Sequence, residues 1–230
     1  MQLRISFFHK SLFLLILLSV NFAITIIMKF KILLLLFLSV VFCFVSNAQE
    51  AGTAGVFGVE KEPLRIYENR GGDFELIGPY GKEISSESFR GKVMLIYFGY
   101  TYCPDVCPMA LTHLKVSMLE LAEQSKEVQF FFVSIDPERD TLEKLKEYVP
   151  YFHPDFIGLT GSVKDVAEVS RQYGARYFKE YVESVEGYFM AHTDAVFIID
   201  QKGRYRGRYK TEWDMEKLIY DIQWLINSGS

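Results

Sequence analysis

The sequence predicts a three-layer α/β domain, in which helices cover a central β-sheet. Two continuous apolar runs, Val93–Phe98 and Val128–Ile135, are typical of strands buried on both faces. Between them, apolar residues recur with helical spacing from Pro104 or Asp105 to about Glu123. A third apolar run, Ala195–Ile199, ends in the turn Asp200–Gly203. Alternating strands and helices of this kind indicate helices packed on a buried sheet.

The remaining elements are shorter. Asp140-x-x-Glu143 and Ser162-x-x-Asp165 have the form of capping boxes, and they predict helices at about 141–148 and 162–173. We expect short strands at Leu64–Tyr67, Phe74–Ile77, Phe156–Leu159 and Tyr205–Tyr209, and a closing helix at Asp214–Asn227. Tyr205–Tyr209 is expected to be the hairpin partner of Ala195–Ile199, which adds a hairpin to the sheet. Gly71-Gly72 separates the first two of the short strands, so these are expected to form a hairpin as well.

The net negative charge of the chain argues against nucleic-acid binding. Residues 1–48 contain four basic residues and no acidic one, out of 25 Lys+Arg and 29 Asp+Glu in the whole chain of 230 residues. The rest of the chain therefore has 25 − 4 = 21 basic and 29 acidic residues, a formal charge of −8. A nucleic-acid-binding domain needs a basic surface. We therefore expect no nucleic acid among the partners.

The first 48 residues are expected to direct export. Lys29 and Lys31 precede the apolar run Ile32–Val45, and small residues follow it up to Ala48, which is the pattern of a signal peptide over residues 28–48. Alternatively, this run and the upstream run Leu12–Met28 form an uncleaved membrane anchor. Either alternative places the protein on the exported, periplasmic side, cleaved and soluble or tethered to the membrane. Residues 49–62 are expected to be a linker, and residues 63–230 the folded domain.

Two cysteines, Cys103 and Cys107, are the only ones after residue 48. A disulfide between them would close a very short loop and add little stability, so the pair indicates chemistry instead. It lies where a central strand ends and a helix begins, the edge at which α/β sheets bind ligands. The helix N-terminus is expected to favour ionisation of both thiols. Their spacing permits either a reversible disulfide or a thiolate chelate for Cu(I), which needs a third ligand.

Three histidines could supply that ligand. His113 lies six residues after Cys107, about 240° around a helix, and is expected to face away from the sulfurs. His153 is expected to lie in a loop without a ligand role. His192 directly precedes the strand Ala195–Ile199. If that strand lies beside Val93–Phe98, His192 faces the cysteine turn.

Four segments in order resemble the Sco/SenC family: FGYTYCPDVCP (98–108), VSIDPERDT (133–141), FIGLTGS (156–162) and AHTDAVFIIDQKG (191–203). The resemblance implies a thioredoxin-like fold with a central mixed β-sheet. It also implies one copper ion, Cu(I) or Cu(II), held by Cys103, Cys107 and His192. Members of the family deliver copper to, or reduce the cysteines of, the dinuclear copper-A site in subunit II of cytochrome c oxidase. Many of them have an acidic residue before the histidine, where this chain has Ala191.

The leading hypothesis is therefore a copper chaperone for cytochrome c oxidase assembly, with subunit II, a copper donor and a thiol reductant as partners. Two alternatives stay open: a thiol–disulfide oxidoreductase acting on the same partner through Cys103 and Cys107, and a redox or copper sensor. Three residues separate the cysteines and Met190–Ala195 contains no proline, unlike a typical thioredoxin. Two nearby acids, Asp105 and Asp136, match family positions that could help to position the loop or the partner, but they are expected to cap the helix and make a turn. Met190 is expected to pack.

Overall fold

The centre of the fold is a five-stranded β-sheet. The computed structural model describes residues 64–181, 187–210 and 215–229. The strands follow the order β5-β4-β3-β8-β9, in which β3, β4 and β5 are parallel and β8 and β9 are antiparallel to their neighbours. Their bounds are Val93–Gly99 (β3), Val128–Ser134 (β4), Ile157–Leu159 (β5), Ala195–Ile199 (β8) and Tyr205–Lys210 (β9). The predicted central mixed sheet is confirmed.

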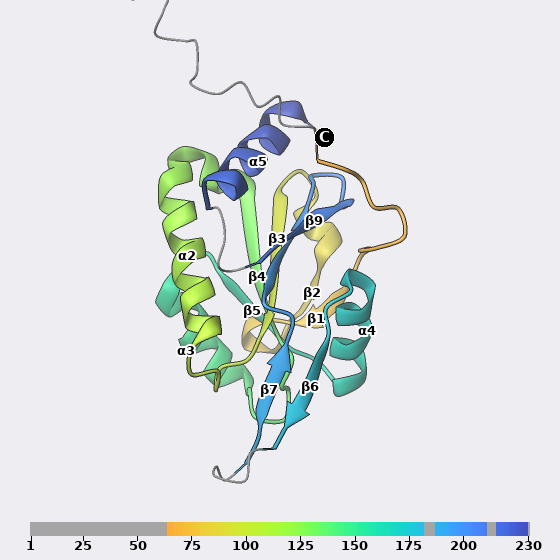
Figure 1. Cartoon of the computed structure of the whole chain (residues 1–230), viewed down its shortest axis with the longest axis vertical. Helices are drawn as coiled ribbons and strands as arrows, with labels where there is room; N and C mark the ends of the chain where they lie inside the picture. Colours follow the sequence, from red (N-terminus) through yellow and green to blue (C-terminus); the bar gives the residue numbers. More distant parts are fainter. Residues whose placement is uncertain (1–63, 182–186, 211–214, 230) are drawn as a thin grey trace, which may run out of the picture. The chain divides into compact units, whose positions relative to one another are not determined.

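Helices cover both faces of this sheet (Figure 1). They are α2 (Val106–Leu121), α3 (Leu142–Phe152), α4 (Val163–Tyr173) and α5 (Met215–Ser228). Side chains of neighbouring strand residues alternate between the faces. Tyr97 therefore points toward α2, where it contacts Cys107, whereas Phe98 packs against Tyr173 of α4. Helix α3 shares the face of α2, since its Tyr148 packs on Phe132 beside Tyr97.

Two hairpins lie outside the central sheet. One pairs β1 (Glu75–Ile77) with β2 (Glu83–Ser85), and the other pairs β6 (Tyr177–Glu180) with β7 (Phe189–His192). The second hairpin was not predicted from the sequence, because most of β6 is exposed and lacks a buried apolar face. It matters for function, since only Thr193 and Asp194 separate β7 from β8. Short 3-10 helices connect other elements: η1 (Pro79–Gly81), η2 (Ser86–Phe89) and η3 (Ala122–Glu127).

The strand predicted at Leu64–Tyr67 is not formed. The side chain of Arg206 donates hydrogen bonds to the carbonyl oxygens of Leu64 and Arg65, and the amide of Tyr67 donates to the carbonyl of Tyr205. With its backbone groups used in this way, the segment does not pair with β1. The hairpin partner of β1 is β2, which follows it in the chain, so the predicted pairing around Gly71-Gly72 was wrong.

Only one of the two predicted capping boxes is present. Ser162 and Asp165 form a complete capping box at the start of α4. Helix α3 instead begins after Thr141, whose hydroxyl accepts a hydrogen bond from the amide of Lys144. The expected cap, Asp140, is buried and binds Thr101 and Ser134. Its carboxylate therefore supports the turn before the cysteines instead of the helix.

The predicted export segment and linker lie outside the described residues, and their boundaries stay predictions. In the part of the chain that the structure describes, no helix is both long enough and apolar enough to cross a bilayer.

Candidate metal centre

Cys103, Cys107 and His192 converge at one edge of the central sheet. Cys103 lies in the turn between β3 and α2, Cys107 lies in the first turn of α2, and His192 is the last residue of β7. Their side-chain ligand atoms all lie within 4.8 Å of one another. The Sγ atom of Cys107 is 3.5 Å from Nε2 of His192. The three residues that the sequence analysis selected thus form one group.

The cysteine turn is not simply two positions on one helix. Helix α2 begins at Val106, so Cys103 precedes it. The amide N–H of Cys107 donates to the sulfur of Cys103 over 3.4 Å, which satisfies one of the free donors at the helix start. Pro108 in the first turn has no N–H to satisfy. A backbone-to-sulfur hydrogen bond therefore contributes to holding the two cysteines together.

Gly99, the last residue of β3, makes room for Cys107. A Cβ atom at this position would lie 2.8 Å from the ring of Phe132 and 3.0 Å from Sγ of Cys107. Both separations are shorter than ordinary van der Waals contact. The absence of a side chain at Gly99 therefore lets the sulfur reach the end of the sheet. The sequence analysis did not single out this glycine, although it stands within the segment FGYTYC.

The orientation of His192 exposes one ring nitrogen to the sulfurs. Its Nδ1 lies 3.2 Å from the carbonyl oxygen of Thr193, which accepts a hydrogen bond from a protonated Nδ1. In the tautomer that carries its proton on Nδ1, the lone pair of Nε2 faces Cys107. Histidine ligands in metal sites are usually oriented in this way by a partner on the second nitrogen. The backbone of Thr193 provides that partner here, where Ala191 offers no carboxylate.

Two tyrosines enclose the imidazole. The rings of Tyr97 and Tyr100 each meet the His192 ring edge to face, with centroids 6.0 Å apart. Tyr97 also donates to Asp194 at 2.9 Å and has its hydroxyl 3.9 Å from Sγ of Cys107. Burial raises the pKa of Tyr97, so its hydroxyl stays protonated and keeps donating. The sequence analysis missed both tyrosines, since only the folded structure shows which aromatic side chains surround the histidine.

The two thiols differ in ionisation, contrary to the expectation that both would be acidic. The hydrogen bond from Cys107 lowers the pKa of Cys103 to about 4, with further help from His192 and from the amides of Asp105 and Cys107 and against the opposing effect of burial. Burial raises the pKa of Cys107, and the charge on neighbouring Cys103 raises it further. When the pair has lost one proton, the other proton therefore stays on the fully buried sulfur of Cys107.

A group of side chains around Arg139 fastens the β6–β7 hairpin to the turn after β4; we call it the hairpin latch (Arg139, Asp136, Glu138, Tyr188 and Lys179). The guanidinium of Arg139 binds the carboxylate of buried Asp136 at 2.5 Å and the carbonyl oxygen of Tyr188 at 2.9 Å. It also lies 3.7 Å from the centre of the Tyr188 ring, a cation–π contact. Arg139 thus connects the 136–139 turn to the strand that carries His192.

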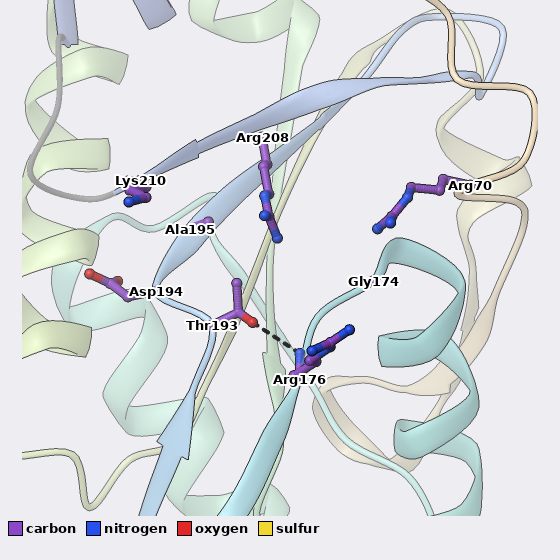
Figure 2. Close-up of a pocket in the computed structure, with 8 residues that line it drawn as sticks. All are labelled: Arg70, Gly174, Arg176, Thr193, Asp194, Ala195, Arg208 and Lys210. Atoms are coloured by element: carbon purple, nitrogen blue, oxygen red, sulfur yellow. Dashed lines mark hydrogen bonds between the residues drawn. The ribbon is translucent and has the colours of Figure 1, made fainter.

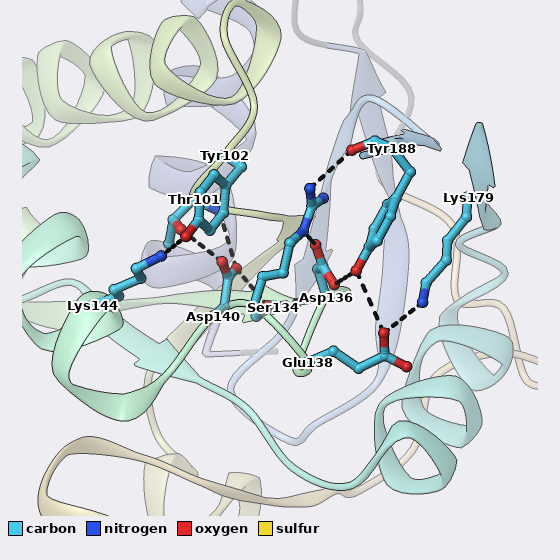
Figure 3. A network of polar contacts seen from close by, with 10 residues as sticks. Thr101, Tyr102, Ser134, Asp136, Glu138, Asp140, Lys144, Lys179 and Tyr188 are labelled. Carbon is cyan, nitrogen blue, oxygen red and sulfur yellow. Dashed lines mark hydrogen bonds and ion pairs between the residues drawn. The ribbon is translucent and has the colours of Figure 1, made fainter. Parts of the chain in front are cut away.

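The rest of the latch reinforces this connection (Figure 3). The Tyr188 hydroxyl donates to Asp136 at 2.9 Å, and Lys179 of β6 pairs with Glu138 at 2.5 Å. Each link joins the hairpin to the same turn, so the latch restrains the position of His192. Asp136 therefore has more than the turn-making role expected from sequence. Asp105 stands at the N-cap position of α2 but makes no side-chain capping bond, so the capping expected of it is absent.

A second polar group, centred on Asp140, holds the turn that contains Cys103. The buried carboxylate of Asp140 accepts hydrogen bonds from the amide of Thr101 at 3.0 Å, from the Thr101 hydroxyl and from Ser134. Burial raises the pKa of Asp140, and the hydrogen bonds from Ser134 and Thr101 oppose that rise. Thr101 lies two residues before Cys103. Asp140 therefore ties the end of β4 to the turn that presents the first sulfur.

The other candidate side chains have ordinary roles. His153 accepts a hydrogen bond from the amide of Asp155 and stacks near Phe156. Met190 is buried in the hydrophobic core, as expected. His113 is half-buried on α2 and is not a member of the Cys103–Cys107–His192 group.

The thiol asymmetry predicts selective alkylation. In the reduced, metal-free protein at pH 6, Cys103 should react readily with iodoacetamide while Cys107 stays unmodified. An ordinary thiol is less than about 1% ionised at that pH, but Cys103 has a pKa of about 4 and is a thiolate. Its reactivity should fall only as the pH drops through about 4. Tandem mass spectrometry assigns the modified cysteine. Equal labelling of the two, or faster labelling of Cys107, contradicts the prediction.

The hairpin latch predicts a local effect of Arg139→Gln. This change removes the ion pair with Asp136 and the bond to the carbonyl of Tyr188, so backbone amides of β7 should exchange hydrogen about tenfold faster or more. Hydrogen-exchange mass spectrometry measures the rates. Arg171→Gln is the matched control, because its ion pair with Glu168 is exposed and 4.0 Å long. Unchanged exchange in β7, or an equal increase in every strand, would show that the latch does not restrain the hairpin.

Known proteins of the Sco family are similar to this chain. The SCO1/SenC family matches residues 64–227. The SCO2-like protein RP587 of Rickettsia prowazekii is 36% identical over 170 residues, which are 72% of this chain and 80% of that protein. The copper-bound structure of ScoI from Bradyrhizobium japonicum has 33% identity and a TM-score of 0.62, covering 68% of this chain and 99% of that one.

Yeast Sco1, also solved with copper bound, has 31% identity and a TM-score of 0.62, covering 70% of this chain and 90% of that chain. These likenesses confirm the thioredoxin-like fold expected from the sequence segments. The chain belongs to the SCO1/SenC family.

Proposed function

We propose that this protein is an exported copper carrier that delivers copper to the dinuclear copper-A site in subunit II of cytochrome c oxidase. It is a member of the Sco family, which is described as a family of cytochrome c oxidase assembly proteins. The observation that carries the proposal is the group of Cys103, Cys107 and His192, whose ligand atoms lie within 4.8 Å of one another. The structures of ScoI from Bradyrhizobium japonicum and of yeast Sco1 were solved with copper bound.

The chemistry of the three side chains suits copper as cargo. Thiolates are soft ligands that favour Cu(I), and an imidazole nitrogen is a good ligand for copper in both oxidation states. Cys103 is already a thiolate, whereas Cys107 must lose its proton when a metal binds, so loading releases one proton. In the tautomer whose Nδ1 donates to Thr193, Nε2 of His192 needs no rearrangement to coordinate.

The burial of the three ligands indicates the route by which copper would enter and leave the site. Cys107 has no exposed surface, Cys103 is 7% exposed, and His192 is half-buried. Tyr102, next to Cys103, is 48% exposed. Copper would therefore enter and leave past Cys103 and His192, while Cys107 stays inside. Delivery would proceed by exchange of these ligands for thiolates of the receiving protein, one bond at a time.

The proposed setting is the exported, periplasmic side of a membrane. The basic residues and apolar run within residues 28–48 support it. The family's link with cytochrome c oxidase is consistent with it. In an oxidising compartment the two thiols need a reductant before they can bind copper, and the apo protein needs a copper donor. Both are therefore proposed as partners.

A second candidate is thiol–disulfide exchange with the same partner, and the split thiol pKa favours it. The Cys103 thiolate would attack one sulfur of the partner's disulfide, and the partner's other sulfur would leave as a thiolate. Cys107 would then give up its proton and attack the Cys103 sulfur, breaking the bond between Cys103 and the partner, whose first sulfur leaves as a second thiolate. The products are a Cys103–Cys107 disulfide and a partner dithiol that has gained two electrons. This chemistry does not need the imidazole of His192.

Anaerobic Cu(I) titration against a chromogenic competitor tests the copper proposal. Wild-type protein should bind one equivalent, and Cys103→Ser and Cys107→Ser should abolish competitive binding. Changes outside the ligand shell typically weaken metal binding by about 10–100-fold, so His192→Ala should weaken it by at least that much. His153→Ala is the control, since that histidine lies in the loop between α3 and β5, where it accepts a bond from the amide of Asp155 and lies beside Phe156.

The outcome of this titration separates the two candidates. Copper binding that is unaffected by either serine substitution contradicts the copper carrier. If His192→Ala leaves both copper affinity and disulfide-exchange rates unchanged, the exchange role is preferred. A loss of exchange in His192→Ala as large as in Cys103→Ser would instead count against the exchange role.

Gly99→Ala should weaken copper binding without changing any ligand. The added Cβ would press on Phe132 and Cys107, which should lower the free energy of unfolding by about 1–3 kcal/mol and displace the sulfur. Gly158→Ala is a matched control: its Cβ would lie 3.0 Å from Val149 and 3.2 Å from Leu145, in the core away from the cysteines. Thermal unfolding and Cu(I) affinity are measured for both. Equal affinity in the two variants would show that the contact at Gly99 does not position Cys107.

A further inference from the structure

A basic cavity lies on the face of the sheet that α4 covers, at the end where β7 continues into β8. Its volume is about 620 Å³. It is lined by Arg70, Gly174, Arg176, Thr193, Asp194, Ala195, Arg208 and Lys210. Four of these side chains are cationic and one is anionic, so the lining carries a formal charge of +3. Residues 49–230 carry a formal charge of −8, which makes this concentration of positive charge unusual.

Three arginines reach the cavity from three separate parts of the fold. Arg70 belongs to the segment before β1, Arg176 immediately precedes β6, and Arg208 is in β9. In Figure 2 their guanidinium groups point toward a common space, with Thr193 beside it and with Asp194 and Lys210 at the opposite side. All three arginines are exposed, so an anion can reach this concentration of positive charge from solution.

These arginines lack the ion pairs that other arginines of the chain make. Arg90, Arg139, Arg171, Arg204 and Arg206 each pair with a carboxylate. Of the arginines that the structure describes, four have no salt bridge: Arg65, Arg70, Arg176 and Arg208. Three of these four line the cavity. The nearest lining carboxylate, Asp194, already accepts a hydrogen bond from Tyr97.

The backbone holds two of the arginines in place. The amide of Arg176 donates to the Thr193 hydroxyl at 3.0 Å, and the amide of Thr193 donates to the carbonyl of Arg176 at 2.8 Å. Arg70 lies against Gly174, where a Cβ atom would come within 1.9 Å of its Nη1. Gly174 also has a φ of +72°, the left-handed conformation that favours glycine after a helix. These contacts fix the backbone of Arg176 beside Thr193 and place the Arg70 side chain at the end of α4.

We propose that this cavity binds a small anion with two or more negative charges, carried by carboxylate or phosphate groups. A guanidinium can bind a carboxylate or a phosphate through two parallel hydrogen bonds, and three of them suit a multiply charged ligand. The volume lies in the range of small-molecule sites, roughly 300–1,000 Å³. A large acidic protein surface would lie near many acidic residues of this chain, because residues 49–230 carry a net charge of −8. A small anion inside the cavity would interact mainly with the charges within about one Debye length, roughly 8 Å, and these are the cationic lining residues.

The anion site is separate from the metal centre. Thr193 and Asp194 line the cavity and directly follow His192, but the His192 ring contacts Tyr97 and Cys107 on the α2 face. An anion in the cavity therefore binds on the opposite face of the sheet from the His192 ring and does not contact the copper ligands. The proposal stands independently of the copper function, and the two can be tested apart.

Isothermal titration calorimetry of the full-length, reduced, metal-free chain tests the site, with citrate, inorganic phosphate and acetate as probes. Citrate or phosphate should bind with 1:1 stoichiometry and acetate much more weakly. Loss of one charge-assisted arginine contact should reduce affinity about tenfold in Arg176→Gln and in Arg208→Gln. Arg208→Lys keeps the charge but loses the planar fork, so its affinity should lie between those of Arg208→Gln and wild type. The stronger of citrate and phosphate identifies the ligand class.

Lys115→Gln is the matched control, because it removes the same charge from the exposed face of α2. It should leave affinity within about twofold of wild type, and thermal unfolding should show that every variant is folded. His192→Ala should bind the anion normally, which separates this test from the copper titration. The proposal is overturned if neither polyanion binds saturably at low salt, or if Lys115→Gln weakens binding as much as Arg208→Gln does. Tighter binding of an acidic peptide than of citrate would also overturn it, in favour of a protein partner.

Discussion

Antiparallel pairing of β8 with β3 is the constraint on which the rest of the site depends. In this register Tyr97 lies opposite Val196, so the residues just before β8 arrive beside the end of β3. The cysteine turn starts at that end. His192 and Cys107 are 85 residues apart in the chain, yet this one strand pairing brings Nε2 and Sγ to 3.5 Å. The parallel pairing of β3 with β4 adds Asp140 and Arg139 at the same edge, because carboxyl ends of parallel strands meet there.

Burial gives the two sulfurs different properties at this edge. Cys107 faces the sheet through the space left by Gly99 and is fully buried, so its thiol keeps its proton. Cys103 precedes the helix, accepts hydrogen bonds and ionises. One ready thiolate, one protected thiol and one imidazole make a site that can take up a soft cation and release it from its outer side. The same asymmetry suits disulfide exchange, and this is why the chemistry of the cysteines alone does not separate the two roles.

The β6–β7 hairpin is held from two sides, which gives His192 a defined position without placing it in the central sheet. On one side the hairpin latch joins Tyr188 and Lys179 to the turn after β4. On the other, Thr193 and Arg176 exchange two hydrogen bonds at the wall of the basic cavity. Polar contacts of this kind are weaker than core packing and can open locally at modest cost. A ligand held by such a hairpin is restrained but remains able to exchange.

The sequence by itself determined the central strands, the helices and the choice of Cys103, Cys107 and His192, because apolar periodicity and the order of the motif segments are local properties of the chain. It did not determine which side chains surround that group. Asp140 satisfies a capping pattern yet is buried under Thr101, since tertiary hydrogen bonds outweighed the local one. Likewise, helix position alone suggested two acidic thiols, and only burial in the folded protein keeps Cys107 protonated. The basic cavity brings together Arg70, Arg176 and Arg208 from three distant segments, so only the tertiary structure could show it.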